Sequence, residues 1–121
     1  MTLTTLAAIF TTALWAARAA SLALALLWGA FFVAHIKEWF IDPKGVWPPP
    51  SVWFFQALHG LMIAGFLVAL KWDRIGMALM LAASVVFFGL IGMNRFPWFA
   101  LVNLIPVALF AAYWALSRRT A

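Results

Sequence analysis

Four strongly polar residues lie inside apolar stretches of the chain: His35, Gln56, His59 and Asn103. His35 and Glu38 are three residues apart on one expected helix, so they share a face of that helix. Gln56 and His59 have the same spacing on the next helix. Two histidines from neighbouring helices can bind a haem iron axially or donate hydrogen bonds to a quinone, and with Glu38 they can hold a metal ion. The ordinary role of such side chains is hydrogen-bonded packing between helices, and we favour that interpretation.

The composition places these residues in a membrane protein. Of the 121 residues, 68% are hydrophobic and 9% are charged, whereas soluble domains are about 45–50% apolar. A bilayer core of about 30 Å needs about 20 apolar residues per helix, so the chain has room for four spans and little else. The net charge of +5 comes from cations scattered at the ends of apolar runs, which indicates topology and not binding of nucleic acid. The absence of cysteine excludes disulfides, thiolate catalysis and cysteine-ligated metals.

The charges, prolines and tryptophans divide the chain into spans. We expect an all-α, polytopic membrane protein whose single domain, residues 1–121, is an antiparallel bundle of four transmembrane helices. The expected spans are residues 17–39, 52–70, 75–93 and 97–116, with a proline-rich outer loop at residues 40–51. Arg18 lies near the middle of the first apolar run, and a cation at the bilayer centre costs about 2.5–3.5 kcal/mol, so Arg18 is expected at the interface. Residues 1–14 then form either an interfacial helix or a helical extension that docks on a partner.

The helix starts have recognisable residues. Ser51 is expected to cap the second span and Asp73 the third, and Pro97 is suited to the first position of the fourth. No Lys or Arg precedes Arg18, so the basic start of a signal peptide is missing, and we expect residue 1 to belong to the mature protein.

The cations predict the orientation in a bacterial inner membrane. Five of them fall on the side of the two termini, Arg18, Lys71, Arg74, Arg118 and Arg119, and three on the other, Lys37, Lys44 and Arg95. This distribution places both termini in the cytoplasm. At about 1.5 Å per helical residue, the four polar residues of the spans then lie within roughly 12 Å of the outer surface, where they can converge on one cavity. The hydroxyls of Ser21 and Ser84 can bond back to their own helices.

Small residues and a proline indicate helix contacts. Gly60 with Ala64, and Ala78 with Ala82, are pairs of small residues four apart that let backbones approach closely. We interpret them as packing inside the bundle, with a dimer interface as the alternative. Pro106 interrupts the last span and frees the carbonyl of Val102, next to Asn103.

The arrangement of the spans resembles a known family. A long first helix that ends in residues 34–39, a polar loop, a second helix that ends in residues 70–72, an immediate turn at residues 73–76 and two more spans are similar to the small bacterial DoxX-like four-helix proteins. The resemblance covers residues 15–116, in helix lengths and loop positions, and carries no catalytic residue. Some DoxX-like proteins are membrane subunits associated with redox enzymes, so the resemblance implies such a role.

Three functions remain after these observations. All carboxylates, Glu38, Asp42 and Asp73, are at expected interfaces, which removes the usual device of proton-coupled cation export. We expect a non-catalytic accessory or structural subunit of a larger membrane complex, such as a respiratory, photosynthetic or oxidase complex. The alternatives are a small haem b- or quinone-binding protein with His35 and His59 at an outer-leaflet site, and an oligomeric transporter or channel. The expected partners are membrane lipid and other membrane subunits or further copies of the chain.

Overall fold

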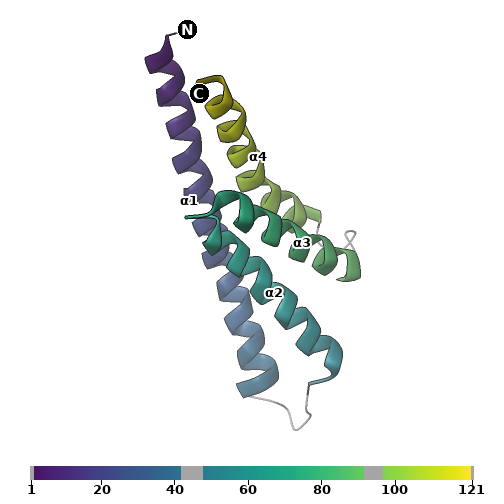
Figure 1. Ribbon diagram of the computed structural model, residues 1–121. Helices are drawn as coiled ribbons and strands as arrows, with labels where there is room; N and C mark the ends of the chain where they lie inside the picture. Colours follow the sequence, from purple (N-terminus) through teal and green to yellow (C-terminus); the bar gives the residue numbers. More distant parts are fainter. Residues whose placement is uncertain (1, 42–47, 92–96, 121) are drawn as a thin grey trace.

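The computed structural model describes residues 2–41, 48–91 and 97–120, and almost all of these residues are helical (Figure 1). The helices are α1 (Leu3–Ile36), which ends in a π-helical turn η1 (Lys37–Ile41), α2 (Pro50–Val68), α3 (Asp73–Ile91) and α4 (Pro97–Thr120). All four are long and apolar enough to cross a membrane, and the described ranges contain no strand. The all-α, four-helix prediction is therefore confirmed, and the helices fit a multi-pass membrane protein. Asp42, Lys44, Arg95 and half of the loop expected at residues 40–51 lie outside the described residues.

The first helix starts well before the expected span. α1 has 34 residues and is unbroken at Arg18, so it is roughly 51 Å long. The Thr2 hydroxyl caps it by accepting a hydrogen bond from the backbone N–H of Thr5 (3.1 Å). Residues 3–16 are therefore a helical extension and not a separate interfacial helix. The extension docks on the chain itself, because Phe10 lies beside Tyr113 of α4 with ring centroids 5.9 Å apart.

The other helix starts agree only in part with the expectations. α2 begins at Pro50 with Pro49 as its N-cap residue and has no side-chain cap, so the Ser51 cap was wrong. The backbone N–H of Val52, which a side-chain cap would otherwise bind, donates instead to the carbonyl of Pro49 (3.0 Å). α3 already begins at Asp73, two residues earlier than expected. α4 begins at Pro97 as predicted, and it continues past residue 116 to Thr120.

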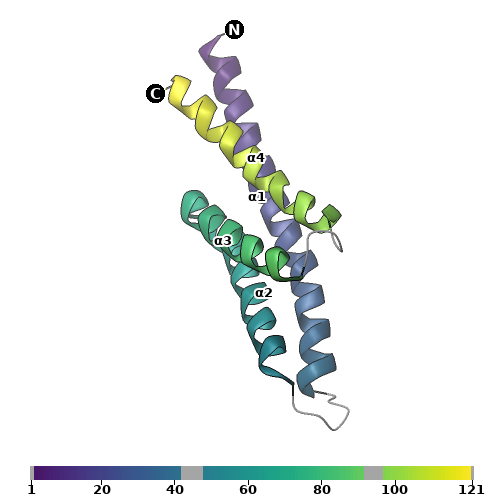
Figure 2. The ribbon, with the colours of Figure 1, turned by 90° about the vertical axis from the view of Figure 1, so that its right-hand side faces the viewer.

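α1 packs against α2 and α4, whereas α3 packs mainly against α2 (Figures 1 and 2). Along α1 and α2 the residue numbers run in opposite directions, since Ser21 contacts Phe66 and Trp28 contacts His59. α4 is also antiparallel to α1 and lies along its N-terminal part. α3 folds back on α2, while α3 and α4 touch little. As a result, α1 and α4 extend together past the α2–α3 turn (Figure 2).

The tightest contact in the bundle joins α2 to α3 at two glycines. A Cβ atom added to Gly65 would lie 2.6 Å from the backbone nitrogen of Met80, and one added to Gly76 would lie 2.2 Å from that of Ala69. Only residues without side chains allow helices to come this close. Around this contact, large side chains with little or no exposure form the core: Met62, Phe66, Met77, Met80 and Phe110.

The small residues that the sequence analysis paired are not at this contact between α2 and α3. Gly60 faces the ring of Phe32, at 3.5 Å from an added Cβ, and Ala64 is half-buried. Ala78 and Ala82 lie on the exposed face of α3, so they do not pack between these four helices. For these two alanines only the interface alternative stays open. The close approach is made by Gly65 and Gly76 and not by the predicted pairs, so the spacing of small residues did not identify the faces of α2 and α3 that pack together.

The α2–α3 contact predicts a difference between two glycine-to-alanine substitutions. We expect Gly65→Ala to lower the free energy of unfolding by about 1–3 kcal/mol, because the new methyl group would overlap the Met80 backbone. Gly89→Ala is the matched control, since an added Cβ there meets nothing within 4 Å. Unfolding in mixed micelles by titration with sodium dodecyl sulfate, followed by circular dichroism, measures both. Equal stability of the two variants would contradict the close approach.

Candidate functional site

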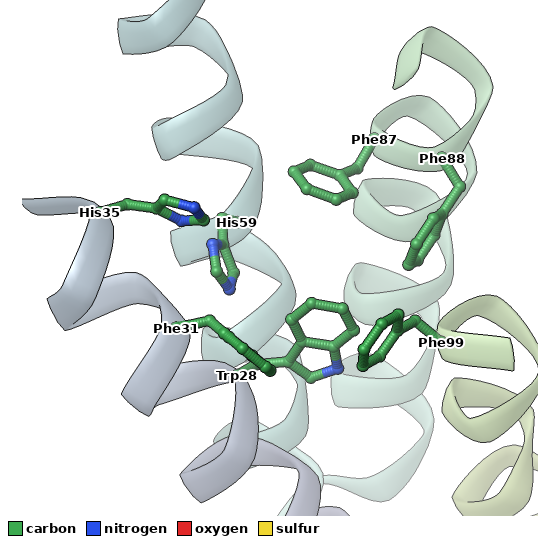
Figure 3. A pocket seen from close by; sticks show the side chains of 7 residues that line it. All are labelled: Trp28, Phe31, His35, His59, Phe87, Phe88 and Phe99. Carbon is green, nitrogen blue, oxygen red and sulfur yellow. The ribbon is translucent and has the colours of Figure 1, made fainter. Parts of the chain in front are cut away.

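A cavity of about 240 Å³ lies where all four helices meet (Figure 3). It is lined by two histidines and five aromatic residues: Trp28, Phe31 and His35 of α1, His59 of α2, Phe87 and Phe88 of α3, and Phe99 of α4. Figure 3 shows the two imidazole rings close together, with the indole of Trp28 and the phenyl rings around the rest of the cavity. The walls are thus flat and apolar, and hydrogen-bonding groups enter from α1 and α2.

His59 is the buried polar group of this cavity. Its side chain is 2% exposed, and its Nε2 atom has no hydrogen-bond partner among the described residues. Aromatic rings surround it at centroid distances of 5.4 Å for Trp28, 5.5 Å for Phe32 and 5.8 Å for Phe87. A buried polar atom without a partner costs about 1–3 kcal/mol. A ligand that bonds to Nε2 would remove this cost.

His35 and Gln56 join His59 as the sequence predicted. The rings of His35 and His59 are 6.1 Å apart between centroids and are inclined by 67°. His35 itself is exposed. Both histidines also line a second cavity of about 270 Å³, together with Gln56, whose amide donates to the carbonyl of Phe32 (3.1 Å). One helical turn between Gln56 and His59 therefore directs both side chains to the space between α1 and α2.

Asn103 does not join them, so the expectation of one common cavity was wrong for this residue. Its Oδ1 atom accepts a hydrogen bond from Nε1 of Trp28 (2.7 Å), and its Nδ2 donates to Sδ of Met62 (3.2 Å) and to Oγ of Ser84 (3.4 Å). The Trp28 ring lines the histidine cavity, while its N–H group donates to Asn103. Asn103 therefore positions a wall of the cavity and links the four helices. Pro106, one turn further along, is fully buried within an α4 that continues on both sides of it.

The sequence interpretation missed the roles of Trp28 and of the serines. Trp28 is the one tryptophan placed deep in an expected span, and that depth was the available signal. A tryptophan buried in an apolar region needs a partner for its N–H group, which points to a nearby acceptor. The Ser21 hydroxyl bonds to the carbonyl of Phe66 in α2 (2.6 Å) and not to its own helix. Ser84 donates within α3, to Sδ of Met80 (3.2 Å), and also receives the bond from Asn103.

The geometry favours a small planar ligand over a metal or a haem. Within residues 2–41, 48–91 and 97–120, no three His, Cys, Asp or Glu side chains lie together as a metal site would require. Glu38 is exposed and lines neither histidine cavity. A haem held between His35 and His59 would have to separate His59 from Phe32 and Trp28, which lie against its ring. A single ring needs no such rearrangement.

A third cavity of about 390 Å³ lies between α3 and α4 and adjoins the first. Phe88 lines both cavities, and Asn103 and Ser84 lie at the inner wall of the third. The other lining residues are mostly aliphatic, among them Leu81, Val85 and Leu104. This space suits a hydrocarbon chain.

No family model, curated protein or solved structure matches the chain. The chemistry of a ligand therefore has to follow from the cavity itself: flat apolar walls, a buried imidazole nitrogen without a partner, and an aliphatic space beside them.

The hydrogen bond between Trp28 and Asn103 predicts a stability effect. We expect Trp28→Phe to lower the free energy of unfolding by about 1–3 kcal/mol, because Oδ1 of Asn103 would remain buried without its donor. Trp98→Phe is the control, since Trp98 is 76% exposed. Thermal unfolding in detergent, followed by near-ultraviolet circular dichroism, measures both variants. If the two substitutions have the same effect, the bond does not stabilise the bundle.

Proposed function

We propose that the protein binds a lipid-soluble quinone or quinol in the cavity lined by His35 and His59. The observation that carries the proposal is the buried Nε2 atom of His59, which lies beside an aromatic cavity and has no hydrogen-bond partner in the part of the chain that the structure describes. Pockets of this kind, mostly apolar with a few well-placed polar groups, are typical of small-molecule sites. The proposal concerns binding, and it assigns no catalytic residue.

The quinone ring matches the cavity in shape and in hydrogen bonding. A planar six-membered ring can pack between the faces and edges of Phe31, Phe87 and Phe99. A quinone carbonyl accepts a hydrogen bond from an imidazole N–H, whereas a quinol hydroxyl donates one to an imidazole nitrogen. Because neutral imidazole has one donor and one acceptor nitrogen, His59 can serve either form by changing its tautomer. His35 lies beside it for the same purpose.

An isoprenoid tail would have an aliphatic space next to the cavity. Phe88 separates the histidine cavity from the space between α3 and α4, and it lines both. The aliphatic residues of that space are suited to hydrocarbon. A ligand in this position would have its ring among the four helices and its tail directed toward the lipid between α3 and α4.

The proposed location is the bacterial inner membrane with both termini in the cytoplasm, which places the histidine cavity in the outer half. The support is the distribution of cations. Among the described residues, four cations lie on the side of the termini and one on the opposite side. The four are Arg18, Lys71, Arg74 and Arg118, and the one is Lys37. This pattern favours the cytoplasm for the termini.

A second candidate is an accessory subunit of a larger membrane complex. Two observations favour it: the small residues Ala78 and Ala82 are exposed on α3, and the N-terminal part of α1 extends with α4 past the α2–α3 turn (Figure 2). Both surfaces are suited to contact with another membrane helix. The DoxX-like resemblance fits this candidate, because some members of that group are subunits of redox enzymes. Quinone binding and a role as a subunit are compatible. An oligomeric transporter remains an alternative that no particular contact favours.

The quinone proposal predicts saturable binding that depends on His59. We expect a ubiquinone analogue with a ten-carbon tail to bind the purified protein in nanodiscs and to quench its tryptophan fluorescence, because Trp28 lines the cavity. His59→Phe keeps a ring of similar size and removes the hydrogen bond, so its Kd should rise about tenfold. The measurement is a fluorescence titration supported by isothermal calorimetry.

A matched variant separates this binding from partitioning into lipid. Phe54→Leu alters an exposed aromatic residue that lines none of the three cavities, so its Kd should equal that of the wild type. Quenching that fails to saturate, or that is the same in wild type and His59→Phe, would refute the proposal. The purified sample also tests the second candidate, since an accessory subunit extracted from its own membranes in mild detergent would bring stoichiometric partner proteins.

The proposed orientation predicts which residues can be labelled from outside the cell. The chain has no native cysteine, so Ser51→Cys provides a single thiol at the exposed start of α2. We expect it to react with a membrane-impermeant maleimide in intact spheroplasts. Arg118→Cys, at the exposed end of α4, should react only after lysis. The reverse result would place the histidine cavity in the cytoplasmic half of the membrane.

A further inference from the structure

Cations gather where the α2–α3 turn ends beside α1. Ser21 bonds to Phe66, and α1 and α2 are antiparallel, so Arg18 is level with the last turn of α2. Lys71 and Arg74 follow directly in the turn and at the start of α3. Because α1 and α4 continue past this turn, the bundle has a corner at this height (Figure 2). We call Arg18, Lys71, Trp72 and Arg74 the step.

Each cation of the step lies over a tryptophan ring. The distances from the cationic group to the ring centroid are 5.1 Å for Arg18 on Trp15, 4.8 Å for Lys71 on Trp72 and 5.4 Å for Arg74 on Trp114. Tryptophan is enriched at the depth of lipid headgroups. A cation held on an indole face at this depth keeps its remaining N–H groups free for an anion.

Among the described residues, the step carries three cations, Arg18, Lys71 and Arg74, against the single carboxylate of Asp73. Arg18 is half-buried, and its Nε atom is buried without a hydrogen-bond partner among the described residues. Of the two acidic residues that the structure describes, Glu38 lies in η1 at the opposite end. Asp73 is at the step, where its carboxylate accepts a hydrogen bond from the indole of Trp114 and supplies one negative charge against three positive ones. The excess of positive charge among the described residues favours an anion from outside the protein.

We infer that the step is a binding site for the phosphate of an anionic phospholipid. A phosphodiester oxygen can accept from the guanidinium of Arg18, and Lys71 lies at the same height to add a second positive charge. The acyl chains would lie along the lipid-facing sides of the helices. The α2–α3 turn lies at headgroup depth in this proposal, while α1 and α4 extend beyond it. A lipid phosphate can therefore lie on the turn, beside the exposed side of α1. The site is at the other end of the bundle from the histidine cavity and does not depend on quinone binding.

The test compares lipids with and without a net charge. The full chain is placed in nanodiscs of phosphatidylcholine that contain an increasing fraction of phosphatidylglycerol, and retained lipid is counted by native mass spectrometry. We expect the wild type to retain phosphatidylglycerol at low fractions. Arg18→Gln and Lys71→Gln should each need about five times more of it for half-saturation. Lys37→Gln, which removes an exposed cation from η1, is the matched control and should behave as the wild type.

Folding and free anions are controlled in the same discs. In pure phosphatidylcholine, Arg18→Gln should unfold at no lower temperature than the wild type, because it removes a cation whose Nε is buried without a partner. Lost lipid retention is then not a result of unfolding. Equal retention by wild type, Arg18→Gln and Lys71→Gln would overturn the inference. An equal loss in Lys37→Gln would also overturn it, as a mere effect of net charge. Stabilisation of the wild type by inorganic phosphate in pure phosphatidylcholine would assign the step to a soluble anion instead.

Discussion

The position of Trp28 connects all four helices. Its N–H bonds to Asn103 of α4, and its ring meets His59 of α2 and Phe88 of α3. In a membrane, the apolar surfaces of helices gain little by leaving lipid, so packing and hydrogen bonds between helices determine how they associate. One buried tryptophan on the longest helix therefore contacts each of the other three. The same ring forms a wall of the histidine cavity, so the contact that organises the fold also shapes the candidate site.

The helices could be predicted well from the sequence, because charges and prolines interrupt the apolar runs at places where a bilayer requires an end. Pro97 illustrates this, since it opens α4 as expected. The continuity of α1 through Arg18 could not be decided, because composition does not show whether a cation ends a helix or only marks a depth. The α2–α3 contact was also beyond prediction. Gly65 and Ala78 are both small, and only the packing shows that the first faces a neighbour and the second does not.

The depth of the site residues in the membrane was predictable from the sequence, but the direction in which each side chain leaves its helix was not. Counting residues from the helix ends gave His35, Gln56, His59 and Asn103 similar depths, and the first three share a cavity. Depth along a helix says nothing about the angle around its axis relative to neighbours. That angle turns Asn103 toward Trp28 and Ser84. The depth of Trp28 was visible in the sequence, but its hydrogen-bond acceptor was not, because that depends on which side chain of another helix lies beside it.

The thin contact between α3 and α4 has a mechanical consequence. α4 is held mainly by α1, whereas α2 and α3 adhere to each other through closely approaching backbones at Gly65 and Gly76. The bundle is therefore built from two closely packed pairs, α1 with α4 and α2 with α3, and separating α3 from α4 breaks few contacts. Elements with few buried contacts open first in thermal fluctuations. If the proposed quinone binds, the seam between α3 and α4 is the side from which a molecule dissolved in the bilayer would reach the cavity, without passing through water.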